Sequence, residues 1–291
     1  MKNSRRDFLK LGGLSALAFA SPIAKASSLL TQELYSPSAK LNNFGIQLWT
    51  VKEDMAANAK DTLKQLASFG YKQVESFEGK EGMFWGMSNK AFKKYMDELG
   101  MKIISAHCDI TKDFERKAAE AAEIGMKYLI CPWKGPQPNI DAFKKFADEF
   151  NNCGEICKKN GIRFAYHNHD YSFKAVDGQL PQDVMMKNTD ASLVDFEMDI
   201  YWVVASGNDP HEWLKKYSHR FRLCHVKDLT RTDKGHESCI LGKGTIDFKS
   251  ILKTAAANGM EYYIVEQEAF TNTNPLSSAK ADAGYMKSFT M

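Results

Sequence analysis

Four side chains able to bind a metal ion follow successive apolar runs in the second half of the chain. They are His167, Asp199, His225 and Glu266. Imidazole and carboxylate groups together suit a borderline divalent cation such as Mn²⁺, Zn²⁺, Fe²⁺ or Co²⁺ better than Ca²⁺, which prefers oxygen ligands alone. We therefore predict a divalent metal site. Each residue also has a structural interpretation on its own; Asp199, for example, is suited to cap the N-terminus of a helix.

Two of these residues are followed by a second titratable side chain at a spacing of two. His169 follows His167, and Glu268 follows Glu266. Residues two apart on a strand point to the same side, so each pair offers one metal ligand and one general base. A metal ion at such a site stabilises the enediolate that is left when a base removes the proton next to a carbonyl. We predict His169 or Glu268 as that base, and whether His167 or His169 is the first ligand stays open.

Tryptophans are expected beside this site. Trp49, Trp133 and Trp202 each stand at or just after the end of an apolar run. Aromatic faces in a polar site suit stacking on the apolar face of a sugar ring, although core packing is the alternative for each of them. The chain has no glycine-rich phosphate-binding loop of the P-loop or dinucleotide type, and GKG at 242–244 is too short to form one. We therefore expect a small carbohydrate as the substrate.

Eight short apolar runs that alternate with amphipathic stretches must position these residues. Strands are predicted at 44–49, 72–77, 102–106, 127–131, 162–167, 192–198, 220–226 and 261–266. Helices are predicted at 55–69, 88–99, 112–124, 139–159, 179–187, 209–217, 246–258 and 275–289, and several end in a glycine typical of a C-cap. Eight such units predict an α/β fold, a single-domain (β/α)8 TIM barrel whose strand C-terminal ends share one face. An open doubly wound sheet is the alternative.

The N-terminal segment has a different character. Residues 1–26 contain Arg5 and Arg6, a short apolar run and a small-x-small end, and SRRDFLK is similar to a twin-arginine export signal. The apolar run is too short to span a membrane. We therefore predict a signal peptide at 1–26, a polar linker at 27–42 and the barrel at 43–291. The protein is expected in the periplasm, with no stable membrane anchor.

The charge of the chain argues against a nucleic-acid partner. The chain has 39 Lys+Arg and 36 Asp+Glu, a formal net charge of +3. Residues 1–26 hold five basic residues and one acidic residue, so the rest carries a net charge of −1. Proteins that bind nucleic acid neutralise its phosphates with clustered Lys and Arg. We expect no nucleic acid as a partner.

Several stretches resemble the sugar phosphate isomerase/epimerase-like superfamily, the xylose isomerase-like TIM barrels. These stretches are FGIQLWTVKEDM, YKQVESF, SAHCDI, AYHNHDYSF, FEMDIYWVVASGNDP, RLCHVKDL, LGKGTIDF and YYIVEQE. The resemblance implies a metal held by Glu, Asp, His and Glu from strands 5 to 8. The last three fall on Asp199, His225 and Glu266. The first falls on His167, so the site has one negative charge less than the usual set.

The same resemblance assigns three further residues and a quaternary state. Glu75 and His107 match positions that contact the substrate, and Lys227 is placed to bind or polarise the substrate oxygens. Barrels of this group often pair, so a homodimer is compatible with the fold.

Three functions remain open at this point. The first is a metal-dependent lyase or hydratase that acts on a keto-sugar or 3-keto-glycoside. The second is a sugar isomerase or epimerase that uses the same proton abstraction, and the third is a non-catalytic sugar-binding barrel. Endonuclease IV, a DNA-repair member of the superfamily, is disfavoured by the near-neutral charge and by the expected export.

Overall fold

The computed structural model describes residues 41, 43–233 and 235–289. The predicted signal peptide at 1–26 and almost all of the predicted linker lie outside the described residues. No described helix has the length and apolar character needed to cross a membrane.

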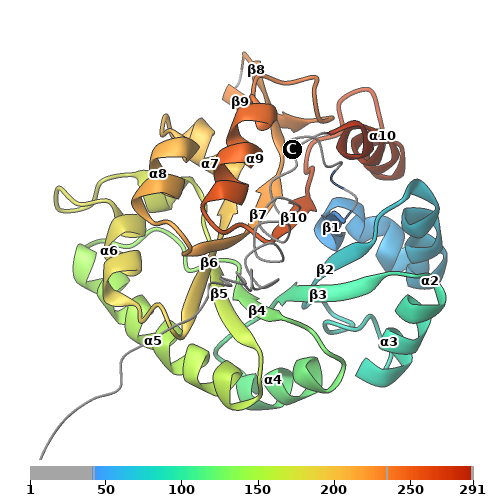
Figure 1. The fold of residues 1–291 in the computed structure, drawn as a ribbon, viewed down its shortest axis with the longest axis horizontal. Coiled ribbons are helices and arrows are strands. Elements are labelled where there is room, and N and C mark those ends of the chain that lie inside the picture. The colour runs from blue at the N-terminus through green and yellow to red at the C-terminus, as the bar shows by residue number, and fades with distance from the viewer. Residues whose placement is uncertain (1–40, 42, 234, 290–291) are drawn as a thin grey trace, which may run out of the picture. The chain divides into compact units, whose positions relative to one another are not determined.

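Eight parallel strands form a closed barrel in the middle of the described residues, with helices around it (Figure 1). The strands are β1 (Gly45–Gln47), β2 (Gln73–Phe77), β3 (Lys102–His107), β4 (Tyr128–Cys131), β5 (Arg163–His167), β6 (Val194–Asp199), β7 (Phe221–Val226) and β10 (Tyr262–Val265). Each strand pairs with its neighbours in chain order, and β10 pairs with β1 to close the barrel. The predicted TIM barrel is confirmed, and every predicted strand overlaps an observed one.

The helices follow the strands as the alternating pattern predicts. They are α2 (Lys52–Phe69), α3 (Asn89–Glu98), α4 (Phe114–Glu123), α5 (Ile140–Lys159), α6 (Pro181–Asn188), α7 (Ile200–Ala205), α8 (Pro210–Lys216), α9 (Phe248–Ala257) and α10 (Pro275–Ser288). Two short 3-10 helices, η1 (Leu48–Val51) and η2 (Asp170–Phe173), follow β1 and β5. Gly70 ends α2 with a φ of 106°, a left-handed conformation that favours glycine.

Side chains inside the barrel change from apolar to polar along the strands. One buried apolar cluster, separate from the main core between strands and helices, is made of Tyr128, Ile130, Ala165 and Leu223. On β5, His167 lies two residues after Ala165, and on β7, His225 lies two residues after Leu223. Both histidines are buried. Alternation along each strand keeps these side chains on the inner face. The polar layer therefore lies at the C-terminal end of the barrel.

Two elements between β6 and α9 are absent from the sequence prediction. One is α7, which starts directly at the end of β6. The other is an antiparallel hairpin of β8 (Asp228–Thr232) and β9 (Gly235–Cys239). Most hairpin side chains are polar and only partly buried, so the hairpin lacks the apolar run by which the other strands were predicted.

The loop after the hairpin wraps around one buried carboxylate. Asp228 Oδ2 accepts hydrogen bonds from the backbone amides of Gly242 and Gly244, at 2.9 and 3.0 Å. Asp228 Oδ1 accepts from the amides of Leu229 and Ile246, at 2.8 and 3.2 Å. The amides of both glycines of the GKG stretch are thus occupied by a carboxylate of the same chain, and the Lys243 amide donates to the Ile240 carbonyl, which agrees with the interpretation that this stretch is no phosphate loop.

Candidate metal centre and active site

The four residues predicted as metal ligands meet at the C-terminal end of β5, β6, β7 and β10. His225 Nδ1 lies 3.1 Å from Glu266 Oε2 and 3.8 Å from Asp199 Oδ2. One ligand atom from each of these three residues lies within 4.8 Å of the others. His167 Nε2 lies 3.8 Å from the same Asp199 Oδ2. One imidazole nitrogen and two carboxylates, those of His225, Asp199 and Glu266, therefore form a group of possible metal ligands, and His167 Nε2 approaches this group at Asp199.

Asp199 tests whether a cation fits at this point of the barrel. Its Oδ1 caps α7 by accepting a hydrogen bond from the Trp202 amide at 3.0 Å. The helix-capping role that the sequence suggested for Asp199 is therefore confirmed. Its Oδ2 is buried without any hydrogen-bond partner among the described residues. The nearest ammonium, Lys227 Nζ, is 3.6 Å away, which is too long for a good hydrogen bond. A buried carboxylate oxygen left unpaired is costly, and a bound cation supplies the missing partner. The donor set fits a divalent ion.

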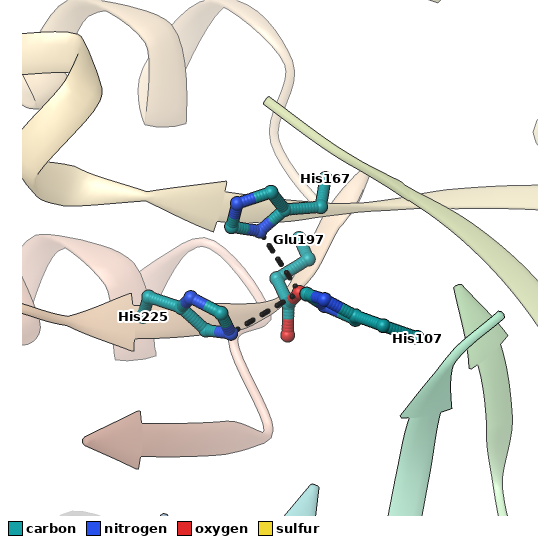
Figure 2. A group of neighbouring side chains, drawn as sticks. All are labelled: His107, His167, Glu197 and His225. Carbon is teal, nitrogen blue, oxygen red and sulfur yellow. Dashed lines mark hydrogen bonds and ion pairs between the residues drawn. The ribbon is translucent and has the colours of Figure 1, made fainter. Parts of the chain in front are cut away.

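A second group of side chains lies deeper in the barrel, behind the first. Figure 2 shows His107, His167 and His225 directed at Glu197. Glu197 Oε2 lies 2.8 Å from His107 Nε2, 3.1 Å from His167 Nδ1 and 3.3 Å from His225 Nε2. Glu75 Oε1 also contacts this group, at 2.7 Å from His225 Nε2 and 3.1 Å from His107 Nε2.

These two carboxylates determine which ring nitrogens face Asp199. The Nδ1 of His167 is engaged by Glu197 and the Nε2 of His225 by Glu75. The remaining nitrogens lie on the side of the candidate ligands: His167 Nε2 is 3.8 Å from Asp199 Oδ2, and His225 Nδ1 is 3.1 Å from Glu266 Oε2 and 3.8 Å from Asp199 Oδ2. This is the usual arrangement in which a carboxylate fixes the tautomer and orientation of a metal-binding histidine.

The electrostatics of the deeper group are set by burial and by the mutual charges. Burial lowers the pKa of His167 well below its usual value, and the charge of His225 adds to the effect, so the ring is neutral. Burial acts in the same direction on His107, but Glu75 and Glu197 outweigh it and raise the pKa of His107 to about 9. Burial and the charge of Glu75 raise the pKa of Glu197 to about 7.

Lys227 occupies the other side of the candidate ligands. Its ammonium donates to Glu266 Oε2 at 3.2 Å and to Glu268 Oε2, and the side chain is 1% exposed. Burial alone lowers the pKa of a lysine, but Glu266 and Asp199 outweigh it and raise the pKa of Lys227, so the ammonium stays charged. A fixed positive charge thus lies next to the candidate metal ligands, although Lys227 is not among the residues that line the neighbouring cavity. Burial and the charge of Glu266 raise the pKa of Glu268.

A cavity of about 310 Å³ opens at this end of the barrel. Seven of the predicted site residues line it: Trp49, His107, Trp133, His167, His169, Glu266 and Glu268. Trp49 and Trp133 are 39% and 53% exposed, and no other large hydrophobic side chain of the described part is exposed. Two of the three predicted tryptophans, Trp49 and Trp133, thus line the cavity.

Two of the residues predicted to bind the substrate, Glu75 and Trp202, do not line this cavity. Glu75 is completely buried beneath the cavity, where Gln47 Nε2 donates to its Oε1 at 2.8 Å and Ser105 Oγ donates to its Oε2. It therefore orients histidines in this structure and does not face the cavity. The Trp202 ring lies behind the cavity wall, 5.6 Å from the ring of His169.

His169 follows the end of β5, at the N-cap position of η2. Its Nδ1 is buried and has no hydrogen-bond partner within the described residues. Its ring contacts that of Trp133 at 4.6 Å. Burial lowers the pKa of His169 to about 4, so the ring is neutral at pH 7.

Glu197 is the functional residue that the sequence prediction missed. The prediction took only the last carboxylate of β6, Asp199. The spacing of two that linked His167 with His169 also applies to Glu197 and Asp199, because both side chains lie on the inner face of β6. The same spacing of two, counted back from Asp199 along the strand, identifies Glu197.

Comparisons with known proteins agree with this geometry. A family model described as "Xylose isomerase-like TIM barrel" matches residues 63–289. An inosose dehydratase from Clostridium beijerinckii is 26% identical over 286 residues, which cover 83% of this chain and 94% of that protein. An inosose dehydratase from Clostridium perfringens is 31% identical over 170 residues, and the match spans 52% of this chain and only 56% of that protein.

A solved structure gives the same picture. The sugar phosphate isomerase/epimerase from Parabacteroides distasonis is 29% identical to this chain, with a TM-score of 0.75. The superposition covers 84% of this chain and 97% of that one. The similarity therefore includes the whole barrel.

Proposed function

Because the chain belongs to the xylose isomerase-like TIM barrel family, we propose that it is a divalent-metal-dependent lyase acting on a keto-sugar or 3-keto-glycoside. The enzyme removes a proton next to the carbonyl and eliminates water or an alcohol from the following carbon. The observation that carries the proposal is the unpaired buried Asp199 Oδ2, with imidazole nitrogens on one side and the charged Lys227 on the other. The similarity to inosose dehydratases over most of the chain supports the elimination outcome.

Four residues would hold the ion: His167 and His225 through nitrogen, Asp199 and Glu266 through oxygen. A divalent ion bound there polarises the carbonyl and stabilises negative charge on adjacent substrate oxygens. Mn²⁺, Zn²⁺, Fe²⁺ and Co²⁺ all suit this donor set. Lys227 adds a second positive charge on the side of Glu268.

Two residues on the cavity wall are able to take the proton. Glu268 is 38% exposed and has a raised pKa, which makes it a stronger base than an ordinary carboxylate and lets it return the proton to water. His169 is neutral and has a free buried nitrogen. We assign the base role to Glu268 first and to His169 second.

His107 is suited to protonate the leaving oxygen. Its Nε2 donates to Glu197, and its pKa of about 9 keeps the ring doubly protonated at neutral pH. Its Nδ1 makes no hydrogen bond within the described part of the chain, and the residue lines the cavity. In the elimination the C–H proton goes to the base and its electron pair forms the new C=C bond. The C–O bond then breaks, and its oxygen takes a proton from His107.

An isomerase or epimerase is the second candidate, supported by the similarity to the sugar phosphate isomerase/epimerase from Parabacteroides distasonis. Its chemistry begins with the same proton abstraction but returns the proton to carbon. Incubation of the metal-loaded protein in D₂O with a 3-keto-glucoside and with a free ketose separates the two. Release of an alcohol or water with an unsaturated keto-sugar identifies the lyase, and deuterium at a retained carbon identifies the epimerase. If neither product forms although the protein binds both metal and sugar, the protein is a non-catalytic sugar-binding barrel.

The location of the protein is a separate proposal. Residues 1–26 direct it to the periplasm by the twin-arginine route, as the Arg5–Arg6 pair and the small-x-small end of this segment suggest. Cell fractionation tests this: the full chain is expected in the periplasmic fraction, and replacement of both arginines by lysine is expected to retain it in the cytoplasm.

A further inference from the structure

A second cavity lies next to the first and shares part of its wall. It has a volume of about 410 Å³. Trp49 and Glu268 line both cavities, so the two adjoin at these side chains. A ligand bound at the candidate metal ligands therefore reaches the second cavity by passing Trp49 and Glu268.

The apolar part of the second cavity is an aromatic pair from two distant parts of the chain. Trp49 belongs to η1, and Phe270 follows β10. The Trp49 ring is held by an edge contact with Phe77 at 5.0 Å between ring centroids. Phe270 is partly exposed and is not among the side chains that pack on the hydrophobic core. It therefore contributes an aromatic wall to the cavity without packing on the hydrophobic core.

The polar part of the cavity comes from the start of α2. Lys52, Glu53 and Asp54 line it. Lys52 Nζ lies 3.9 Å above the Trp49 ring. The side chains of Lys52 and Glu53 form no hydrogen bond or ion pair with any other described residue. Hydrogen-bonding groups of both kinds are thus free to meet a ligand.

We propose that the second cavity binds a second sugar ring, the leaving group of the substrate, so that the substrate is a keto-disaccharide or a larger keto-glycoside. This inference rests on the proposed function, because it places the keto-sugar ring in the first cavity. The bond that breaks, between the carbon next but one to the carbonyl and the glycosidic oxygen, then lies beside Glu268. Glu268 takes the C–H proton, and the leaving oxygen takes a proton from His107 in the first cavity, so the sugar departs as its free alcohol.

The chemistry of the lining favours a sugar over other leaving groups. Sugar hydroxyls donate to Glu53 and Asp54 and accept from Lys52, while the C–H face of the ring lies on Trp49 or Phe270. An aromatic leaving group would bury these charged groups without hydrogen-bond partners. An anionic leaving group would be repelled, because three of the lining residues, Glu53, Asp54 and Glu268, are acidic.

Equilibrium binding of sugars without a keto group tests the second cavity independently of turnover. Calorimetry on the metal-loaded protein compares methyl glucoside with maltose and cellobiose, which differ in their linkage. We expect the better disaccharide to bind about 10-fold more tightly than methyl glucoside, the effect of one aromatic contact with added hydrogen bonds. F270A and E53Q are expected to remove most of this difference and to leave the binding of methyl glucoside unchanged.

W133A is the matched variant, because Trp133 lines only the first cavity. It is expected to weaken the binding of methyl glucoside and of the disaccharides to the same extent. Equal binding of methyl glucoside and both disaccharides, or equal weakening of all ligands by F270A, would overturn the proposal. If phenyl glucoside binds more tightly than either disaccharide and E53Q does not change its affinity, the second cavity binds an aromatic leaving group and the sugar proposal is wrong. The absence of alcohol release from any keto-glycoside, with the binding pattern intact, would overturn the lyase and leave the second sugar site in place.

Discussion

At the scale of single residues, the site depends on carboxylates that need not touch the metal ion. Glu197 and Glu75 lie behind the candidate ligands and hold one nitrogen each of His167 and His225. The other nitrogens then face Asp199 without having to rotate. The orientation of these two imidazoles is present before any cation binds, which lowers the cost of binding it.

Replacing Glu197 by glutamine tests this role. The amide keeps the shape of the side chain but loses the charge that holds His167 Nδ1, so the ring is no longer fixed in the required tautomer. We expect E197Q to weaken metal affinity by about 10- to 100-fold, the usual effect of removing such a partner, in a protein that still folds. Isothermal titration with Zn²⁺ or Mn²⁺ measures this. E98Q, the same change at an exposed position, is the control and is expected to bind like the wild type; an unchanged affinity in E197Q would show that Glu197 has no part in binding.

The sequence predicted the four ligand candidates because each one ends an apolar run, and strand ends in a parallel barrel meet on one face. It did not predict Glu197, whose apolar neighbours hide it inside the strand. Nor did it predict that Glu75 lies beneath the cavity, since burial along the barrel axis depends on the stagger of the strands. A sequence pattern gives the face of a strand but not the depth of a residue along the axis.

At the scale of elements, the sequence predicted the barrel but not the elements added to it, such as the β8–β9 hairpin. The eight strands and the helices after them carry strong apolar periodicity. The β8–β9 hairpin has none, because it is stabilised by backbone pairing and by the Asp228 carboxylate that binds the following loop. Such a contact links residues 14 to 16 positions apart and leaves no local pattern.

Gly244 is the position where this loop tolerates no side chain. A Cβ there would lie 2.2 Å from Asp228 Oδ1 and 2.5 Å from the Leu229 carbonyl oxygen. We expect G244A to lower the free energy of unfolding by about 1–3 kcal/mol, since the loop must move away from the carboxylate. Urea denaturation measures it. G284A is the control: this glycine is exposed within α10 with nothing within 4 Å of an added Cβ, and alanine there is expected to stabilise by about 1 kcal/mol.

Asp282 on α10 should make stability depend on pH. Its Oδ1 accepts from the Leu241 amide at 2.8 Å, and its Oδ2 is buried without a partner among the described residues. Burial, with a smaller effect from the Asp228 charge, raises the pKa of Asp282 to about 7 from 3.8. The folded protein therefore prefers the protonated carboxyl. Its contribution to stability is complete below pH 3.8 and is lost as pH rises through about 7.

Thermal unfolding of D282N across this range checks the effect. The asparagine cannot ionise, so the variant is expected to lose less stability than the wild type between pH 5 and pH 8. From pH 5 to pH 8, the free energy of unfolding of D282N is expected to rise relative to that of the wild type by on the order of 1–3 kcal/mol. Parallel curves for the two proteins would show that the Asp282 carboxyl is not protonated in the native state.

At the scale of the whole molecule, the barrel has an apolar interior at one end and a concentration of buried charge at the other. Four carboxylates are buried there, Glu75, Glu197, Asp199 and Glu266, together with three histidines and Lys227. Burying this many ionisable groups opposes folding unless each one is paired. One oxygen of each deeper carboxylate meets a histidine, whereas Asp199 Oδ2 and Glu197 Oε1 have no hydrogen bond within the described part of the chain. A divalent ion at Asp199 should therefore stabilise the entire fold.

A cation that binds only the folded state raises its stability by mass action, by about 2.7 kcal/mol at a concentration 100 times Kd. We expect the Tm of the wild type to rise when Zn²⁺ or Mn²⁺ is added and to fall when a chelator is added, and D199N to respond to neither. Calorimetric scans of both proteins measure this, and elemental analysis should find a single ion per chain. His167 gives one nitrogen to Glu197 and has only one left for a metal, and His225 Nδ1 already lies beside Glu266, a candidate ligand of the same ion. A second ion, or an equal rise in Tm in D199N, would instead place metal binding in the deeper group of His107, His167, Glu197 and His225.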